Sequence, residues 1–230
     1  MPPVQAPHGP LRSYGRIKSR NLKPRQAEIL ARRSDDVSLP DPEVGPIDPK
    51  SIAPNAAETW LEIGFGGGEH MVEQARRSPQ TLVIGAEPFF NGFASAVRHI
   101  EETGVDNVRV LQGDARALLA ALPDASLTRV FILFPDPWPK ARHHKRRLVQ
   151  DEVIAELSRT VRPGGRLRFA TDWADYADWS LRRLLRSPDW RWLARRADDW
   201  RTPPADHITT RYEMKRLGDC APVFLEFERR

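Results

Sequence analysis

The sequence predicts an α/β protein built on a doubly wound, mostly parallel sheet and preceded by a basic N-terminal arm. Three observations lead to this prediction. Short apolar runs alternate with amphipathic segments from residue 59 onward, which is typical of repeated βα units. A glycine-rich loop follows the first apolar run. Net positive charge is concentrated in residues 1–33, and prolines are concentrated in the first 54 residues.

The N-terminal quarter differs in composition from the rest of the chain. Residues 1–33 hold eight basic side chains and one acid, residues 34–58 hold six acids and one lysine, and ten of the 21 prolines lie in the first 54 residues. Such a composition is typical of an arm and linker rather than a packed core. We therefore expect residues 1–57 to be a basic arm and Pro-rich linker, partly disordered, and residues 58–230 to form one domain.

Three arginines of the arm, Arg12, Arg16 and Arg20, are spaced four residues apart. Residues at this spacing are neighbours on a helix, so they would share one side if the segment became helical on a partner. A basic tail can also be a solvated segment without function. The spacing, together with the formal net charge of +5, favours contact with an anionic partner such as nucleic acid.

The remaining residues predict the strands and helices of the domain. Apolar runs predict strands at 60–63, 82–86, 108–111, 130–134, 167–170 and 223–227. Amphipathic segments predict helices near 68–77, 89–103, 115–121, 145–161 and 174–186. Because the apolar runs are continuous rather than alternating, we expect helices on both faces of the sheet.

The sequence also predicts the cellular compartment. No stretch approaches the about 18–20 consecutive apolar residues of a membrane span, and the N-terminus has no signal-peptide pattern. The single cysteine, Cys220, excludes an intramolecular disulfide. No metal site is expected, since His143 and His144 are adjacent, their side chains diverge, and no acid or cysteine completes a cluster. We expect a cytoplasmic protein without a membrane partner.

The loop after the first strand runs from Glu62 through Gly64, Gly66 and Gly68 to Glu69. Glycines allow positive φ and a close approach of the backbone to a ligand at the carboxyl edge of the sheet. A dinucleotide-binding loop would have a small residue where Glu69 stands, and a P-loop would end in Gly-Lys-Ser/Thr, which is absent. An acid followed by alternate glycines suits a positively charged cofactor without phosphates, and S-adenosylmethionine fits.

Two further acids follow the next strands. Glu87 lies where an acid accepts hydrogen bonds from ribose hydroxyls, and Asp114 lies where a carboxylate can take an adenine amino group or its neighbours. Each acid could instead cap the helix that follows. Three acids at the ends of three strands around a glycine loop favour the cofactor site.

The fourth strand leads into a stiff loop that carries Asp136. Prolines at 135, 137 and 139 fix φ on alternate residues and remove backbone donors. Trp138 offers a flat face on which a base can stack. Five cations follow in residues 140–147: Lys140, Arg142, Lys145, Arg146 and Arg147. Such a run is often only a solvated face, but beside an acid and an indole it favours phosphate binding.

The fifth strand ends in Asp172, again beside a tryptophan, and a further polar group follows far downstream: Thr210, Arg211, Tyr212 and Glu213. Carboxylates can accept hydrogen bonds from N1–H and the 2-amino group of guanine, which identifies that base when it is turned out of its stack. Asp172 could instead cap the following helix. We expect these residues on the substrate side.

The motifs together resemble those of the bacterial single-chain tRNA (guanine-N7-)-methyltransferases. The segments that carry the resemblance are residues 62–68, residues 134–138 with the basic run 140–147, residues 171–173 and residues 210–213. The likeness extends from about Arg12 to the C-terminus. Its most specific part is the proline-acid-proline-tryptophan segment with its basic continuation.

The resemblance implies a class I methyltransferase fold with a seven-stranded sheet, S-adenosylmethionine as methyl donor and the variable-loop guanine of tRNA, position 46, as acceptor. It implies no obligatory protein partner. Carried over by motif, the cofactor side comprises Glu62, Gly64, Gly66, Gly68, Glu87, Asp114 and Asp136. The guanine side comprises Lys140, Asp172 and Thr210 to Glu213, and tRNA phosphates would contact Arg12, Arg16, Arg20, Arg142, Lys145, Arg146 and Arg147.

Guanine N7 carries a free lone pair, so methyl transfer to it needs no general base. Asp136 is then expected to stabilise the positive charge that moves onto the base. One alternative is a methyltransferase for an exocyclic amine, because acid-proline-aromatic loops also grip amino groups. A second alternative is a non-catalytic RNA-binding protein on the same scaffold.

Overall fold

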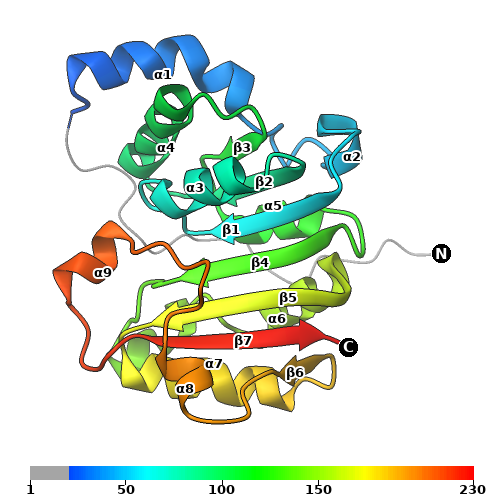
Figure 1. Ribbon diagram of the computed structural model, residues 1–230, viewed down its shortest axis with the longest axis vertical. Helices are drawn as coiled ribbons and strands as arrows, with labels where there is room; N and C mark the ends of the chain where they lie inside the picture. Colours follow the sequence, from blue (N-terminus) through cyan, green and yellow to red (C-terminus); the bar gives the residue numbers. More distant parts are fainter. Residues whose placement is uncertain (1–20) are drawn as a thin grey trace.

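The computed structural model describes residues 21–230, and within them a single seven-stranded sheet forms the centre of the molecule (Figure 1). The strands are β1 (Glu58–Ile63), β2 (Thr81–Ala86), β3 (Val108–Leu111), β4 (Leu127–Leu133), β5 (Val161–Thr171), β6 (Trp190–Trp192) and β7 (Val223–Arg229). Their order is β3-β2-β1-β4-β5-β7-β6, with β1 to β5 parallel and β7 antiparallel to both neighbours. The predicted doubly wound, mostly parallel sheet is confirmed.

The helices that cover the sheet are α1 (Pro24–Val37), α2 (Pro49–Ile52), α3 (Glu69–Arg77), α4 (Phe90–Thr103), α5 (Ala115–Ala121), α6 (Asp151–Thr160), α7 (Ala174–Arg186), α8 (Asp198–Arg201) and α9 (Arg211–Lys215). A 3₁₀ helix, η1, spans Ala141–Arg146. In the segment predicted as one helix over 145–161, η1 and α6 are separated by residues 147–150, and β5 begins directly after α6. No helix among residues 21–230 is long and apolar enough to cross a membrane.

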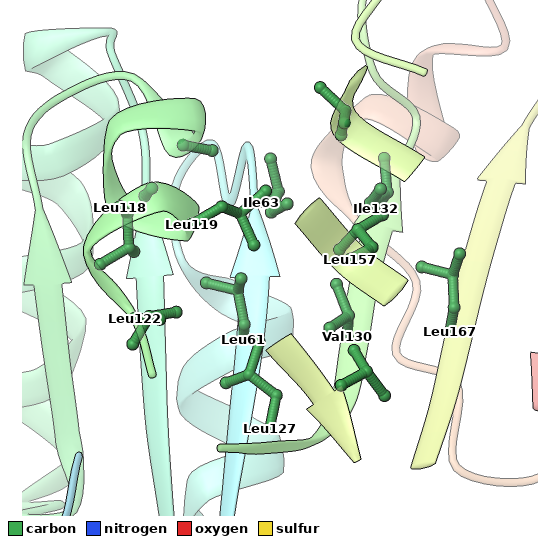
Figure 2. Close-up of a cluster of buried hydrophobic side chains, with 14 of the residues drawn as sticks. Leu61, Ile63, Leu118, Leu119, Leu122, Leu127, Val130, Ile132, Leu157 and Leu167 are labelled. Atoms are coloured by element: carbon green, nitrogen blue, oxygen red, sulfur yellow. The ribbon is translucent and has the colours of Figure 1, made fainter. Parts of the chain in front are cut away.

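Two apolar layers hold the helices on the sheet. Figure 2 shows the larger layer, in which Leu118 and Leu119 of α5 and Leu157 of α6 pack on Leu61 of β1 and Val130 of β4. On the opposite face, α3 and α4 pack over β2 and β3 through a second cluster. Both faces of the central strands are therefore covered, as their continuous apolar runs predicted.

The structure corrects the expectation that residues before 58 lie outside the packed domain. Helix α1 packs along α4 and buries Ile29 and Val37. Beyond it, the backbone N–H of Leu39 donates to Val110 of β3, and Ile47 is buried in the larger cluster. These apolar residues are spaced so that they face the domain and become buried. The average composition of the segment gives no information on this spacing. Residues 1–20, with Arg12, Arg16 and Arg20, lie outside the described part of the chain.

The docking of α1 gives a first prediction. Replacing Ile29 by Ala removes a side chain that is 5% exposed in the contact between α1 and α4. The free energy of unfolding should fall by about 2–5 kcal/mol, measured by chemical denaturation. Leu185 on α7 is 52% exposed, so Leu185→Ala is the control and should change the free energy by less than about 0.5 kcal/mol. Equal effects of the two variants would show that α1 is not docked in solution.

Candidate active site

The predicted site residues lie at the carboxyl edge of the parallel strands, because β1 to β5 all end at that edge. The strand order reverses at β1, which lies between β2 and β4, and such a switch point is where open α/β sheets bind their ligands. Figure 1 shows α9 on the same side, beyond the arrowheads of β1 and β5. Residues that are far apart in the sequence, from the end of β1 to α9, therefore lie at the same edge of the sheet.

The glycine loop takes the left-handed conformation at three positions. Gly64, Gly66 and Gly68 have φ of 73°, 55° and 82°. A Cβ at Gly64 or Gly66 would meet nothing within 4 Å, whereas one at Gly68 would lie 2.7 Å from Cβ of Ala96. Gly68 thus allows close packing on α4. Gly64 and Gly66 leave their backbone open to a ligand, which fits the predicted cofactor.

Glu87 fastens this loop to the end of β2. Its Oε2 accepts from the backbone N–H of Gly66 at 2.8 Å, and its Oε1 accepts from that of Phe89 at 2.9 Å. Burial raises the pKa of Glu87, the two backbone hydrogen bonds oppose this, and the charges of Asp136 and Glu62 raise it further. The carboxylate retains lone pairs for further donors, since each oxygen has accepted one bond.

Glu62 and Asp114 are both held by neighbouring side chains. Glu62 is 3% exposed and its Oε2 lies 2.6 Å from Nδ1 of His70. Asp114 caps α5, since its Oδ1 accepts from the backbone N–H of Arg116 and from that residue's Nε. Burial alone would raise the pKa of Asp114, but its hydrogen bonds from Arg116 lower it. The helix-cap alternative is therefore realised at Asp114, and it leaves the cofactor contact there a prediction.

Asp136 lies on a loop that is strained at both ends. Phe134 and Trp138 have φ of 51° and 44°, which L residues with large side chains rarely adopt. Partial desolvation raises the pKa of Asp136. Its charge also contributes to the raised pKa of Glu87 on one side and of Tyr212 on the other. Asp136 is therefore near enough to Glu87 and to Tyr212 for its charge to act on both.

On the substrate side, Asp172 is 3% exposed and is held by the chain around Gly218. Its Oδ2 accepts from the backbone N–H of Gly218 at 2.9 Å, and a Cβ on Gly218 would lie 2.0 Å from the Asp172 carbonyl oxygen. Oδ1 of Asp172 is buried and has no hydrogen-bond partner among the described residues. Trp173 Nε1 donates to the Tyr212 hydroxyl at 3.3 Å, which brings the two substrate-side segments together.

The residues from Thr210 to Glu213 start α9 with a capping box. The Thr210 hydroxyl accepts from the backbone N–H of Glu213, and Glu213 Oε2 accepts from that of Thr210. Nε2 of His207 lies 2.9 Å from the same carboxylate oxygen. Arg211 pairs with Glu69 at 2.5 Å, so the substrate-side segment is tied to the first turn after the glycine loop.

The chain is similar to named methyltransferases over almost its whole length. A model of a methyltransferase family matches residues 56–224. The tRNA (guanine-N(7)-)-methyltransferase of Caulobacter vibrioides strain NA1000 is 60% identical over 98% of both chains. The proteins of that name from Hyphomonas neptunium and Rhodospirillum rubrum are 51% and 43% identical over 94% and 95% of this chain and 99% and 88% of theirs. The chain belongs to the tRNA (guanine-N(7)-)-methyltransferase family.

Solved structures support the same fold at much lower sequence identity. TrmN from Thermus thermophilus matches with a TM-score of 0.54 and 16% identity over 79% of this chain and 47% of that chain. An rRNA methylase from Streptococcus thermophilus matches with a TM-score of 0.52 and 12% identity over 76% and 88% of the two chains. The predicted class I methyltransferase fold is confirmed, and proteins of this fold generally use S-adenosylmethionine.

The basic run of this family member divides into exposed and buried cations. Lys140, Arg142 and Lys145 are exposed. The guanidinium of Arg146 lies 5.0 Å above the ring centroid of Trp138, so it covers the indole face on which a base was expected to stack.

Arg147 is a correction to the predicted phosphate contacts. It is 2% exposed, its Nε donates to the carbonyl of Pro137 at 2.9 Å, and its NH2 group donates to Asp175. The guanidinium also lies within 5.0 Å of the ring centroid of Trp179. Arg147 directly follows η1 and points inward, where it holds the loop of Asp136 instead of a phosphate.

Two residues that shape the site were not predicted from the sequence. Gly92 lies in the first turn of α4, and a Cβ there would lie 2.4 Å from the carbonyl oxygen of Gly66. Nδ1 of His99 lies 2.8 Å from the carbonyl oxygen of Gly67. A glycine inside an amphipathic helix is a signal of close backbone approach and could have identified Gly92. For His99 the sequence holds no such signal.

Gly92 gives a second prediction. In Gly92→Ala the methyl group pushes against the carbonyl oxygen of Gly66, so the cofactor loop must shift. The affinity for S-adenosylmethionine, measured by calorimetry, should fall by about tenfold or more. Gly45→Ala is the control because a Cβ there meets nothing within 4 Å. Unchanged affinity in Gly92→Ala would show that this loop does not bind the cofactor.

Proposed function

We propose that this protein transfers the methyl group of S-adenosylmethionine to N7 of a guanine in tRNA, the variable-loop guanine at position 46. The observation that carries the proposal is the position of Asp136. Its charge acts on Glu87 beside the glycine loop and on Tyr212 beside Asp172. Family membership supports the same reaction, because relatives that match nearly the full chain are named for it.

The cofactor side suits a cationic donor. Part of the raised pKa of Glu87 comes from the negative charges of Asp136 and Glu62. A positive ligand relieves this repulsion, whereas a phosphate increases it. We assign the ribose hydroxyls to Glu87, the adenine end to Asp114, and the open backbone of Gly64 and Gly66 to the body of the cofactor.

The substrate side suits a guanine that has left its stack. The buried Oδ1 of Asp172 makes no hydrogen bond of good geometry among the described residues, although the Tyr212 hydroxyl lies near the same carboxylate, and N1–H and the 2-amino group of guanine are donors that can satisfy it. Lys140 is exposed at the start of η1, on the same chain segment as Asp136. The tRNA phosphates are assigned to Arg142, Lys145 and Arg146, and to Arg12, Arg16 and Arg20 of the arm.

The mechanism follows from the charge that moves during transfer. When bound, S-adenosylmethionine supplies a methyl group on a sulfonium, and N7 needs no proton removed before attack. The base becomes cationic, and Asp136 stabilises that charge from a loop held by two strained residues and by Arg147. Because the loop is already ordered, little reorganisation accompanies the reaction.

The third prediction tests the reaction itself. The protein should label unmodified tRNA from S-adenosylmethionine, and nucleoside mapping should find N7-methylguanosine at position 46. Chain cleavage with borohydride and aniline at that site distinguishes the product from a methylated exocyclic amine, which is not cleaved. The RNA-binding alternative is favoured if calorimetry detects tRNA binding but no binding of S-adenosylmethionine.

The fourth prediction concerns Asp136. Asp136→Asn keeps the shape of the side chain but removes its charge, so kcat on saturating tRNA should fall by about 10²–10³-fold. In the unsubstituted protein the carboxyl must be ionised, and its pKa is raised, so kcat should decline as pH falls through that raised pKa. Asp178→Asn, on the exposed face of α7, is the control. Near-normal kcat in Asp136→Asn would show that another group stabilises the charge.

A further inference from the structure

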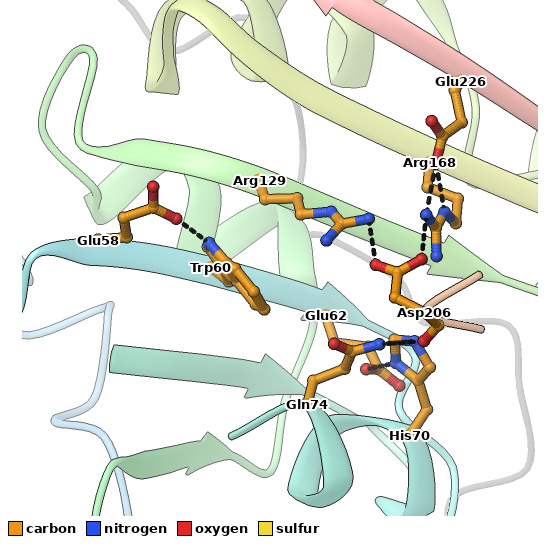
Figure 3. A network of polar contacts seen from close by, with 9 residues as sticks. All are labelled: Glu58, Trp60, Glu62, His70, Gln74, Arg129, Arg168, Asp206 and Glu226. Atoms are coloured by element: carbon orange, nitrogen blue, oxygen red, sulfur yellow. Dashed lines mark hydrogen bonds and ion pairs between the residues drawn. The ribbon is translucent and has the colours of Figure 1, made fainter. Parts of the chain in front are cut away.

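A partly buried polar network lies on the sheet face over β1, β4 and β5 and reaches the cofactor side at one residue only, Glu62 (Figure 3). It joins side chains of β4, β5 and β7 to Asp206, which belongs to the segment between α8 and α9. Within it, Arg168 is 3% exposed and His70 is 1% exposed. Burial of such groups is costly unless they are paired, so their contacts with neighbouring polar groups matter.

Asp206 is the point at which the strands meet this segment. Its Oδ2 lies 2.7 Å from Arg129 of β4, and its Oδ1 lies 2.7 Å from Arg168 of β5. Arg168 has a second carboxylate, Glu226 of β7, at 2.5 Å. Although burial alone would raise it, the two arginines lower the pKa of Asp206 to about 2. The carboxylate therefore stays ionised and clamps the segment to two strands.

A directed chain of hydrogen bonds ties the same residue to the cofactor side. Nε2 of Gln74 donates to the backbone carbonyl of Asp206 at 2.8 Å, and this fixes the orientation of the amide. The same Nε2 lies 3.2 Å from Nε2 of His70, which must therefore accept. His70 then carries its proton on Nδ1 and donates it to Glu62 at 2.6 Å. Figure 3 shows Glu62, His70, Gln74 and Asp206 gathered near the end of β1.

The segment that Asp206 anchors leads directly to the guanine side. His207 is the next residue, and its Nε2 contacts Glu213, the residue that completes the capping box of α9. Helix α9 has five residues and is too short to hold its own position. Its orientation depends on the contacts of Arg211 with Glu69 and of Tyr212 with Trp173, and on the residues before it, which are attached to the sheet at Asp206.

We propose that Asp206 is a positioning residue that sets the place of residues 207–213 relative to Glu62, through Arg129 and Arg168 on one side and Gln74 and His70 on the other. Asp206 does not touch the reacting atoms. Because this role concerns guanine binding, it rests on the proposed function. Loss of the anchor should weaken productive tRNA binding and leave cofactor binding intact.

The fifth prediction compares Asp206→Asn with Glu226→Gln. Both variants remove one carboxylate from the buried Arg168, but only the first releases the segment. In Asp206→Asn, amide hydrogens of residues 207–213 should exchange about tenfold faster or more, and KM for tRNA should rise by about tenfold or more. The Kd for S-adenosylmethionine should stay within about threefold. Glu226→Gln should leave exchange in residues 207–213 and KM for tRNA nearly unchanged.

A second variant covers the case in which Asp206→Asn does not fold. Gln74→Met removes the donor to the Asp206 carbonyl while both ion pairs remain, and it should raise exchange in residues 207–213 and KM for tRNA in the same direction. Equal effects of Asp206→Asn and Glu226→Gln would reduce Asp206 to a counter-ion and overturn the proposal, as would unchanged exchange in Gln74→Met. Exchange is measured without tRNA, so it tests the anchor even if the protein forms no N7-methylguanosine.

Discussion

The gathering of like charges at the carboxyl edge of the sheet constrains the rest of the site. Glu62 lies at the end of β1, Glu87 directly follows β2, and Asp136 lies in the loop after β4. These three strands are adjacent and parallel. Each carboxylate must be held in place by groups other than a cation, because a nearby cation would neutralise the charge that attracts the ligand. His70 supports Glu62, and backbone N–H groups support Glu87. The site therefore presents negative charge, which suits the sulfonium of the proposed cofactor and disfavours a phosphate.

The sequence was sufficient for the features that parallel topology determines. Acids and glycines that end consecutive apolar runs must meet at one edge if the runs are parallel strands, so Glu87, Asp136 and Asp172 could be placed together without coordinates. Helix α1 could not be placed in this way. Its few buried residues, such as Ile29, lie among charges and prolines, and only the partner surface on α4 shows which positions are covered.

Buried arginines mark a second limit of the sequence. Arg147 and Arg168 look like members of a basic surface in the composition, yet both are almost fully buried and paired with acids. A count of charges cannot distinguish an arginine that binds phosphate from one that binds a carboxylate of its own chain, because both need the same planar fork. The basic run that faces solvent is correspondingly smaller than the five cations of residues 140–147 suggest.

The distribution of charge over the sheet also explains how a short segment can carry half of a precise site. Methyl transfer depends on alignment within a fraction of an ångström, and elements such as α9 cannot supply that rigidity alone. The chain instead places Arg129 on β4 and Arg168 on β5. If this face of the sheet were purely apolar, the covering segment would still bind to it, but its register would not be fixed. A carboxylate between the half-buried guanidinium of Arg129 and the buried one of Arg168 has one well-defined position. Removing these charges from water costs free energy. In return, the ion pairs of Asp206 fix the position of residues 207–213, which do not contact the two arginines themselves.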